Sequence, residues 1–463
     1  MTIFITISRG SIVRNLLQNE FFNLLKEKFD KVVILSFAAS NEEFLRQFQK
    51  DNVEIIPLLE SQSSRFDQLV CNINKYLAYN SSVSSRSRWG FYPGQNELSP
   101  ALRYLKYIAL KIIFQPLTKV TAVRKFWQCL DYLFFQRDIV QEYQKIIKEY
   151  KPNLVFVSSI LDETEVALLK AAKKERVYTV AMPKSWDNPS KRYFRFKPDK
   201  LVVWSPFMKK QVKKLQDYKS DEVEVIGIPQ FDYYIDKTRI SSRENFCKSL
   251  GLNPQRRILL YGSEGRITPD DPRVVEIIKD MIKGGELIKD CQILVRPHYG
   301  YANDELKFKE YFNDNKDVFV DLNFKKSNFS DNWDYSTNQM NHFLNSLYHC
   351  DVLLNVASTL TIDTAAVDKP VILIYFDGYE EKDYRHSVKR LYESDYLQEL
   401  VSYNAALKVS NPEELKRAIN TFLVDPKYLN NERIKLREHF CYKLDGMAGE
   451  RLFQFIYKIV KNR

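Results

Sequence analysis

The chain has 463 residues, of which 44% are hydrophobic and 14% aromatic, with only 13 glycines and 17 prolines. This composition excludes disordered, collagen-like and low-complexity chains, and at roughly 100–200 residues per domain the length predicts two or three domains. The net charge of +11 is unevenly spread, because residues 1–236 carry +10 and residues 237–463 carry +1.

Neither a signal peptide nor a membrane span is expected. The first apolar run, Thr2–Ile7, is short and is followed by Arg9. The most hydrophobic later stretch, 104–114, contains two lysines and is far shorter than the roughly 20 apolar residues of a spanning helix. The six cysteines include no Cys-x-x-Cys pair, which suits a reducing compartment. We therefore expect a cytoplasmic protein.

The first half repeats short apolar strands, each followed by a helix, which is typical of βαβ units around a parallel sheet. Thr2–Ile7 is the first predicted strand, and an amphipathic run at Ser11–Phe29 and a strand at Lys31–Leu35 follow it. Further strands are predicted at Val53–Leu58, Asn153–Ser158, Tyr178–Met182, Lys200–Trp204 and Glu222–Ile228, and helices at Glu163–Lys174 and Pro206–Leu215.

The stretch between about residues 61 and 144 interrupts this pattern and predicts a helical insertion in the first domain. It combines a Ser-rich loop with long helices rich in basic and aromatic residues, and residues 81–140 supply +6 of the charge surplus. We interpret it as a face for the anionic inner membrane leaflet or for an acidic glycan. A solvated basic surface over an aromatic core is the alternative.

The second half restarts the strand and helix pattern after Gly227–Asp232 and a polar linker. Strands are predicted at Arg257–Tyr261, Gln292–Val295, Val318–Val320, Val352–Asn355 and Val371–Tyr375, and a final amphipathic helix at Ala448–Val460. The predicted fold is therefore α/β. It has a Rossmann-like domain at residues 1–236, a second at 237–447, and a terminal helix at 448–463 that packs back on the first domain.

Ligands of open α/β sheets bind beyond the carboxyl ends of the strands, so candidate residues follow the predicted strands. Ser358 and Thr359 would open a helix whose free N–H groups favour an anion such as a diphosphate. Asp363, one turn further on, could accept hydrogen bonds from ribose hydroxyls. The alternative is that Ser358 or Thr359 only caps the helix.

Two more turns of the second domain carry polar residues. Arg296 suits bidentate phosphate binding, and His298 can donate to a phosphate or act as an acid. The turn holding Gly262, Ser263 and Arg266 is a weaker candidate, in which the glycine would let the backbone approach a ligand.

In the first domain, Arg9 and Gly10 follow the first strand and would face the cleft between the domains. Trp186, Asp187 and Asn188 lie between two prolines, an unusual composition for an ordinary loop. Asp187 could act as a general base and Trp186 could stack on a sugar. A rigid surface turn with Asp187 as its cap is the alternative.

Absent motifs narrow the chemistry. The chain has no Gly-x-Gly-x-x-Gly, no Walker sequence, no Asp-x-Asp and no His/Cys cluster with ligand spacing. A dinucleotide dehydrogenase, a P-loop ATPase and a dedicated metal site are therefore disfavoured, and neither a metal nor a cofactor is expected.

The ordered set of these motifs resembles bacterial glycosyltransferases of the GT-B fold. Within them, it is similar to surface-polysaccharide enzymes such as CDP-glycerol glycerophosphotransferases and Kdo transferases. The resemblance covers the chain outside the insertion, with Thr359 where a second Ser is usual and Tyr299 where Pro is common. It rests on Trp186-Asp187-Asn188, Gly227-Ile228-Pro229-Gln230-Phe231-Asp232, Arg296-Pro297-His298, Ala357-Ser358-Thr359 and Asp445-Gly446-Met447-Ala448-Gly449-Glu450-Arg451.

This resemblance implies a metal-independent glycosyltransferase that uses a nucleotide-sugar donor and a glycan or lipid-linked acceptor at the inner face of the plasma membrane. Ser358 and Thr359 would hold the donor diphosphate, with Arg296 and His298 near it, while the acceptor lies against the first domain. The resemblance also places Asp363 near the ribose. Together with the turns described above, the residues expected at the donor are Gly262, Ser263, Arg266, Ser358, Thr359 and Asp363, those at the acceptor Arg9, Gly10, Trp186 and Asn188, and those in catalysis Asp187, His298 and Arg296.

Three alternatives remain open. One is a glycerophosphotransferase with a CDP-linked donor, and another is an enzyme similar to UDP-N-acetylglucosamine 2-epimerases. The third is a nucleic-acid-binding protein, which is disfavoured because the aromatic residues fit no known nucleic-acid motif and the charge is modest for the length.

Overall fold

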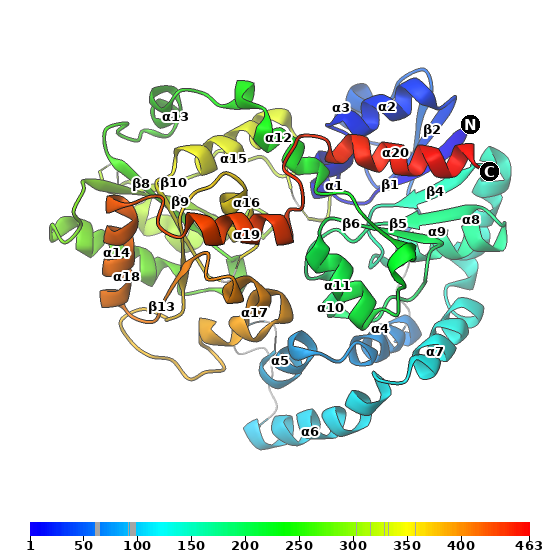
Figure 1. The fold of residues 1–463 in the computed structure, drawn as a ribbon, viewed down its shortest axis with the longest axis horizontal. Coiled ribbons are helices and arrows are strands. Elements are labelled where there is room, and N and C mark those ends of the chain that lie inside the picture. Colours follow the sequence, from blue (N-terminus) through cyan, green and yellow to red (C-terminus); the bar gives the residue numbers. More distant parts are fainter. Residues whose placement is uncertain are drawn as a thin grey trace.

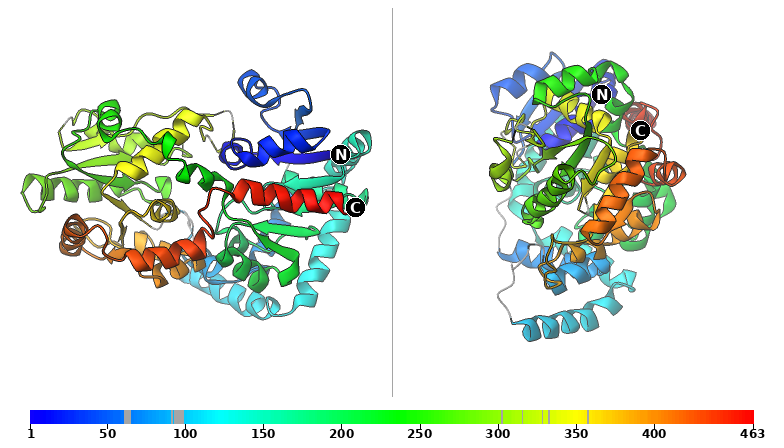
Figure 2. Two further views of the ribbon diagram at one scale, coloured as in Figure 1. Left: turned by 45° about the horizontal axis from the view of Figure 1, so that its top comes forward. Right: turned by 90° about the vertical axis from the view of Figure 1, so that its left-hand side faces the viewer.

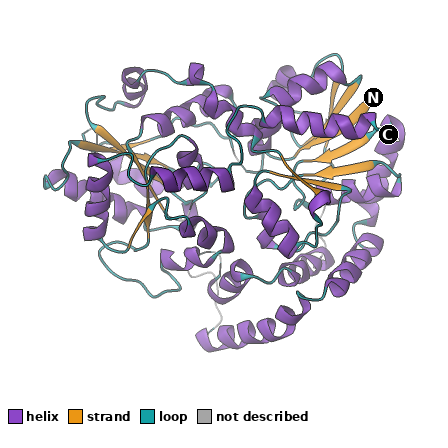
Figure 3. Cartoon of the chain, viewed as in Figure 1, coloured by secondary structure: helices purple, strands orange, loops and turns teal. Residues whose placement is uncertain are grey.

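The protein is described from a computed structural model that covers residues 1–60, 65–90, 92, 99–301, 303–314, 316–327, 329–331, 333–356 and 358–463. Two α/β units lie side by side, each a parallel sheet with helices on both faces (Figures 1 and 3). The predicted architecture of two Rossmann-like domains with a helical insertion and a terminal helix is confirmed.

The first sheet has seven parallel strands in the order β3-β2-β1-β4-β5-β6-β7. All the strands predicted in this half are present; the inner ones are buried apolar runs, and the edge strands β3 and β7 are partly exposed. The strands are β1 (Thr2–Ile7), β2 (Lys31–Ser36), β3 (Val53–Pro57), β4 (Leu154–Val157), β5 (Tyr178–Ala181), β6 (Lys200–Val203) and β7 (Val223–Val225).

The helices of the first sheet include one departure from the sequence prediction. The run expected as a single helix forms α1 (Gly10–Leu16) and α2 (Glu20–Lys28), because the Asn19 side chain accepts a hydrogen bond from the Phe21 N–H and caps the second helix. The others are α3 (Glu42–Phe48), α9 (Glu163–Lys174), α10 (Asn188–Lys191) and α11 (Pro206–Leu215).

The second sheet has six parallel strands in the order β10-β9-β8-β11-β12-β13. Its strands are β8 (Arg257–Gly262), β9 (Cys291–Arg296), β10 (Val318–Val320), β11 (Val352–Asn355), β12 (Val371–Ile374) and β13 (Leu407–Val409). Its helices are α13 (Arg243–Leu250), α14 (Asp271–Lys283), α15 (Thr337–His349), α16 (Leu360–Ala366), α17 (Asp395–Ser402), α18 (Pro412–Val424) and α19 (Asn430–Phe440).

The insertion is helical throughout its described part, while residues 61–64, 91 and 93–98 of the predicted stretch lie outside the described residues. A buried ionic cluster joins it to the first domain. Arg195 contacts Asp131 at 2.7 Å, Asp67 at 3.3 Å and also Glu163, and Lys170 contacts Asp131 at 2.5 Å. The helices are α4 (Arg65–Leu77), α5 (Ser81–Trp89), α6 (Pro100–Leu117), α7 (Thr121–Phe134) and α8 (Arg137–Tyr150).

The chain crosses between the domains twice. The first crossing contains α12 (Asp232–Ile235), and the second leads from α19 into α20 (Ala448–Lys461). Helix α20 lies along α2 of the first domain (Figures 1 and 2), where the rings of Phe29 and Tyr457 are 6.1 Å apart. The Asp232 carboxylate accepts hydrogen bonds from the N–H groups of Ala448 and Gly449, at 3.0 and 2.8 Å, so the two crossings are tied together.

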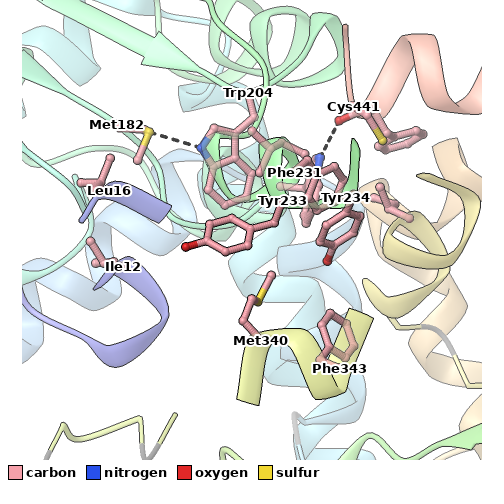
Figure 4. Close-up of a cluster of buried hydrophobic side chains, with 14 of the residues drawn as sticks. Ile12, Leu16, Met182, Trp204, Phe231, Tyr233, Tyr234, Met340, Phe343 and Cys441 are labelled. Carbon is pink, nitrogen blue, oxygen red and sulfur yellow. Dashed lines mark hydrogen bonds between the residues drawn. The ribbon is translucent and has the colours of Figure 1, made fainter. Parts of the chain in front are cut away.

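A third connection is made by the described residues of the segment 321–336, which we call the strap. The Asp331 carboxylate accepts hydrogen bonds from the backbone N–H groups of Gly10 and Ser11, at 3.1 and 3.2 Å, and from the Ser11 hydroxyl at 2.8 Å. Tyr335 packs edge-on against Phe44 of α3. Beneath it, residues of α1 and α15 and aromatic residues of the first crossing form one apolar cluster across the domain boundary (Figure 4).

Candidate functional site

A cavity of about 520 Å³ lies between the two domains. Loops after β1, β5, β8, β9 and β11 line it, so the carboxyl ends of both sheets meet there, as expected for this class of fold. Helix α5 of the insertion and the segment around residue 390 complete the walls. The basic residues in the lining are Arg9, Arg14, Arg86, Lys184, Arg296 and Arg390, and the acidic ones are Asp187, Glu264, Asp331 and Asp363.

The structure brings most of the predicted residues to this cavity. Those in its lining are Arg9, Trp186, Asp187, Gly262, Ser263, Arg296, His298, Ser358, Thr359 and Asp363. Three predicted residues lie outside the lining, namely Gly10, Asn188 and Arg266.

The turn after β8 is largely held by its own contacts. A Cβ on Gly262 would lie 2.4 Å from a Leu360 side-chain carbon, so the glycine permits α16 to pack closely. The Ser263 hydroxyl donates to Asp304 at 2.8 Å and accepts from the Gly265 N–H at 3.0 Å. Arg266 is exposed on the outer side of this turn, away from the predicted donor site.

Glu264, in the same turn, is a cleft residue that the sequence analysis missed. Burial raises the pKa of its carboxyl to about 8; Asp271 and Asp304 add to the effect, and a hydrogen bond with Ser358 opposes it. Glu264 is therefore protonated at neutral pH. It offers a proton donor without placing another negative charge beside an anionic ligand. Its position directly after a strand was the available signal.

Arg296 and His298 reach the cavity from the end of β9. The Arg296 guanidinium lies over the rings of Tyr299 and Phe343, at 4.3 and 4.5 Å from their centroids. Burial lowers the pKa of His298 to about 4; Asp304 opposes the shift and the positive Arg296 reinforces it. The imidazole is therefore neutral at neutral pH, and its buried Nδ1 has no hydrogen-bond partner among the described residues.

The segment before α16 both caps that helix and lines the cavity. The Ser358 hydroxyl accepts a hydrogen bond from the Leu360 N–H at 3.1 Å, as a cap would, and Ser358 and Thr359 both line the cavity. Ala357 lies outside the described residues. Asp363 accepts a hydrogen bond from the Tyr234 hydroxyl at 2.6 Å. Burial raises the pKa of Asp363 to about 6, although Tyr234 and the nearby Arg14 oppose the shift.

Trp186 is mainly a contact between the domains. Its indole N–H donates to the Phe440 carbonyl at 2.8 Å, and its ring packs edge-on against Trp204. Only 6% of the residue is exposed, so little of the ring is available to stack on a sugar.

Asp187 is the acidic residue of that loop in the cavity lining. Burial would raise the pKa of Asp187, but Lys191, at 2.8 Å, and Arg86 lower it to about 2. Asn188 is fully buried, and its side-chain oxygen accepts from the Lys184 N–H at 3.0 Å. Asn188 therefore stabilises the loop conformation and does not line the cavity.

The loop after β1 meets charges from both domains. Arg9 and Lys184 both contact Asp162, at 3.3 and 2.8 Å. A Cβ on Gly10 would lie 2.3 Å from the Trp333 carbonyl oxygen, so the glycine allows the strap to approach α1. Gly10 thus belongs to the domain contact.

Two parallel sheets facing each other across a polar cleft define the GT-B fold. The fold is shared with the UDP-GlcNAc 2-epimerase of Neisseria meningitidis bound to UDP-GlcNAc, at 11% identity over 99% of both chains and a TM-score of 0.55. It is shared too with a glycosyltransferase from Rickettsia africae, at 14% identity over 100% of this chain and 99% of that chain and a TM-score of 0.53.

Residues 169–458 match the family described as CDP-Glycerol:Poly(glycerophosphate) glycerophosphotransferase, and the chain belongs to this family. No curated protein sequence matches the chain. The family favours glycerophosphate transfer, the alternative in the sequence analysis, over the sugar transfer that the analysis placed first. The matched residues include the cleft positions from Trp186 to Asp363 and exclude those after β1.

Proposed function

We propose that the protein transfers a glycerophosphate, or a closely related polyol-phosphate unit, from a CDP-linked donor to a hydroxyl of an anionic poly(glycerophosphate)-like acceptor. The observation that carries this proposal is the family match over residues 169–458, which spans the second domain and its half of the cleft. The basic lining of the cavity supports it, because donor and acceptor are both polyanions.

In this reaction the acceptor hydroxyl oxygen attacks the distal phosphorus of the donor, the bond from that phosphorus to the bridging oxygen breaks, and CMP leaves. Arg296 is placed to balance charge on the phosphates in the transition state. Asp187, with a pKa of about 2, is a weak base, and we assign it to orienting the hydroxyl. His298, with a pKa of about 4, is the stronger base of the two, and its neutral imidazole has a buried Nδ1 without a partner among the described residues, so we assign it to taking the proton that the hydroxyl loses.

The test is CMP release from CDP-glycerol, with poly(glycerophosphate) as acceptor, against a panel of UDP-, GDP- and CMP-linked sugars. Among these donors, only CDP-glycerol is expected to release CMP and to extend the acceptor. Turnover restricted to a nucleotide sugar would contradict the proposal in favour of glycosyl transfer, and isomerisation of UDP-GlcNAc without acceptor would favour an epimerase.

Replacing Arg296 or His298 by Ala should abolish this turnover, because each removes a group at the phosphates. Circular dichroism should show an intact fold, since both side chains reach the cavity from the end of a strand that stays in place. The exposed Arg46→Gln on α3 is the matched control and should keep the wild-type rate. Wild-type rates in both Ala variants would refute the assigned donor site.

We also propose that the outer face of α6 and α7 docks on an anionic bilayer. Leu105, Ile112 and Phe126 are 63%, 68% and 66% exposed, and with Leu102 and Leu133 they form helically spaced apolar stripes on consecutive helices. Residues 99–130 contain no Asp or Glu and six Lys and Arg. Helix α6 lies at the outer edge of the molecule, apart from both sheets (Figures 1 and 2). Within the described ranges, no helix is long and apolar enough to cross a membrane.

Co-sedimentation with phosphatidylglycerol vesicles tests this surface. Binding is expected to weaken in Ile112→Gln/Phe126→Gln and in high salt, and to be weaker still with phosphatidylcholine vesicles. Val424→Gln removes an equally exposed apolar residue on α18 and should leave binding unchanged. Equal sedimentation of both variants and the wild type would show that the outer face of α6 and α7 does not bind the bilayer.

A further inference from the structure

Arg14 on α1 is a buried cation of the cleft to which the family match gives no role, because it lies outside residues 169–458. It is 7% exposed and lines the cavity. Its guanidinium carbon lies 4.8 Å from the centroid of the Trp333 ring, and its terminal nitrogen contacts the Met340 sulfur at 3.8 Å. Its Nε is buried without a hydrogen-bond partner among the described residues.

Arg296 faces the same cavity from the other domain and is also buried, at 6% exposure. Both guanidiniums rest on aromatic rings, and neither forms an ion pair with any described carboxylate. Two other buried arginines are paired: Arg195 with Asp131 at 2.7 Å, and Arg433 with Asp368 at 3.0 Å. The Asp363 carboxylate acts on both charges but forms no ion pair with either guanidinium. A single carboxylate cannot neutralise two buried cations, and an uncompensated buried charge is costly, so the cavity favours a ligand that supplies further negative charge.

The two guanidiniums also lie close together. Arg14 contacts Met340 and Arg296 lies over Phe343, and these two residues are one turn apart on α15. Figure 4 shows Met340 and Phe343 side by side, facing the cluster that includes Ile12 and Leu16 of α1. Arg14 and Arg296 therefore approach one point from opposite sides of the domain boundary.

We propose that Arg14 and Arg296 form one phosphate site that bridges the two domains and takes a phosphate of the donor's diphosphate. Two guanidinium forks can satisfy the oxygens of a single phosphate, and a shared ligand would hold the first domain against the second. This inference rests on the proposed function where it names the donor as the ligand. The binding site itself requires only that the ligand be a nucleoside diphosphate.

The proposed site predicts an unusual effect of replacing Arg14 on the thermal stability of the protein. If Arg14 were a structural residue, replacing it would destabilise the protein. If it is held for a ligand, replacing it by an uncharged side chain of similar length removes a buried, unpaired charge. Arg14→Met should therefore raise the midpoint of thermal unfolding of the ligand-free protein while weakening binding of a nucleoside diphosphate.

The experiment is calorimetric titration of wild type, Arg14→Met, Arg14→Lys and Arg296→Met with CDP and with cytidine. CDP affinity should fall by about tenfold to a hundredfold in each Met variant, the range expected for hydrogen bonds to a charged group, and cytidine affinity should not change. Arg14→Lys keeps the charge without the fork and should fall between wild type and Arg14→Met. The double Met variant should lose less than the two single losses combined, because both residues hold one phosphate.

Arg46→Gln, an exposed arginine on α3, is the control and should bind CDP as wild type does. Wild-type CDP affinity in Arg14→Met and Arg14→Lys, or fully additive losses in the double variant, would overturn the inference. Arg14-dependent binding of CDP or UDP without turnover of CDP-glycerol would overturn only the proposed function. Turnover of CDP-glycerol that is unchanged in Arg14→Met would overturn only the inference.

Discussion

At the scale of single residues, the cleft is distinguished by ionisable groups in unusual protonation states. Glu264 is protonated and His298 is neutral at neutral pH, and burial is the largest cause in both cases. Asp187 shows the opposite outcome, because two cations outweigh its burial and keep it ionised. The same cleft thus offers a proton donor, a neutral imidazole and a carboxylate at one pH.

Glu264→Gln should change how stability depends on pH. Between the ordinary pKa of 4.5 and the native value of about 8, the native state keeps a proton that the unfolded chain has lost. The free energy of unfolding of the wild type therefore falls as pH rises through this window, by at most about 1.4 kcal/mol per pH unit from this group. The variant lacks the effect, so its stability relative to wild type should increase from pH 5 to pH 8 in urea unfolding. If the free energy of unfolding of the two proteins changed with pH in parallel, Glu264 would not have a raised pKa in the native state.

Sequence reasoning located cleft residues at or shortly after strand ends, such as Arg296, His298 and Asp187. It could not identify Arg14, whose place in the site depends on how α1 packs against α15 and the strap. Trp186 was selected because an indole ring can stack on a sugar. In the structure its N–H donates to the Phe440 carbonyl across the domain boundary, and the ring is packed there. Such contacts join residues more than 200 positions apart, and no local pattern encodes them.

At the scale of elements, continuous apolar runs between turn residues identified the buried strands. The edge strand β13 was not predicted, because the exposed Lys408 at its centre interrupts the apolar run that marks β10, a strand of the same length. The helix predicted at 11–29 was divided by the Asn19 cap, a local signal that the analysis passed over. Helix α20 was found from its periodicity, but its anchor on Asp232 lies far away in the sequence.

Asp232→Ala should loosen α20 at its first turn. The carboxylate serves two N–H groups that have no acceptor within the helix, so its loss should lower the free energy of unfolding by about 1–2 kcal/mol. Hydrogen exchange should accelerate at Ala448 and Gly449 in particular. Asp232→Asn keeps one acceptor oxygen and should give an intermediate result. Unchanged exchange at both amides in Asp232→Ala would show that the cap contributes nothing.

At the scale of the whole molecule, three connections hold the domains in one arrangement: the crossing through α12, the crossing into α20, and the strap. The net charge is also divided unequally between the domains. The nearly neutral second half supplies a few placed groups at the cleft, while much of the surplus of the first half lies on the insertion. The strap also packs on α3 through Tyr335, but all the hydrogen bonds that its described residues form with the start of α1 are accepted by the Asp331 carboxylate, so a single substitution can loosen it.

Asp331→Ala should therefore open the ligand-free molecule. It removes the acceptor for the Gly10 and Ser11 N–H groups and for the Ser11 hydroxyl, and charged hydrogen bonds of this kind contribute roughly 1–3 kcal/mol each. The radius of gyration from small-angle scattering should increase, and amide exchange at Gly10 and Ser11 should accelerate. Asp334→Ala alters the same strap at a residue whose carboxylate accepts from the nearby Ser336 N–H, and it should change neither measurement. Adding CDP should reduce the difference between Asp331→Ala and wild type, because a phosphate shared by Arg14 and Arg296 would close the domains without the strap. Unchanged scattering and exchange in Asp331→Ala would mean that the two chain crossings alone fix the domain arrangement.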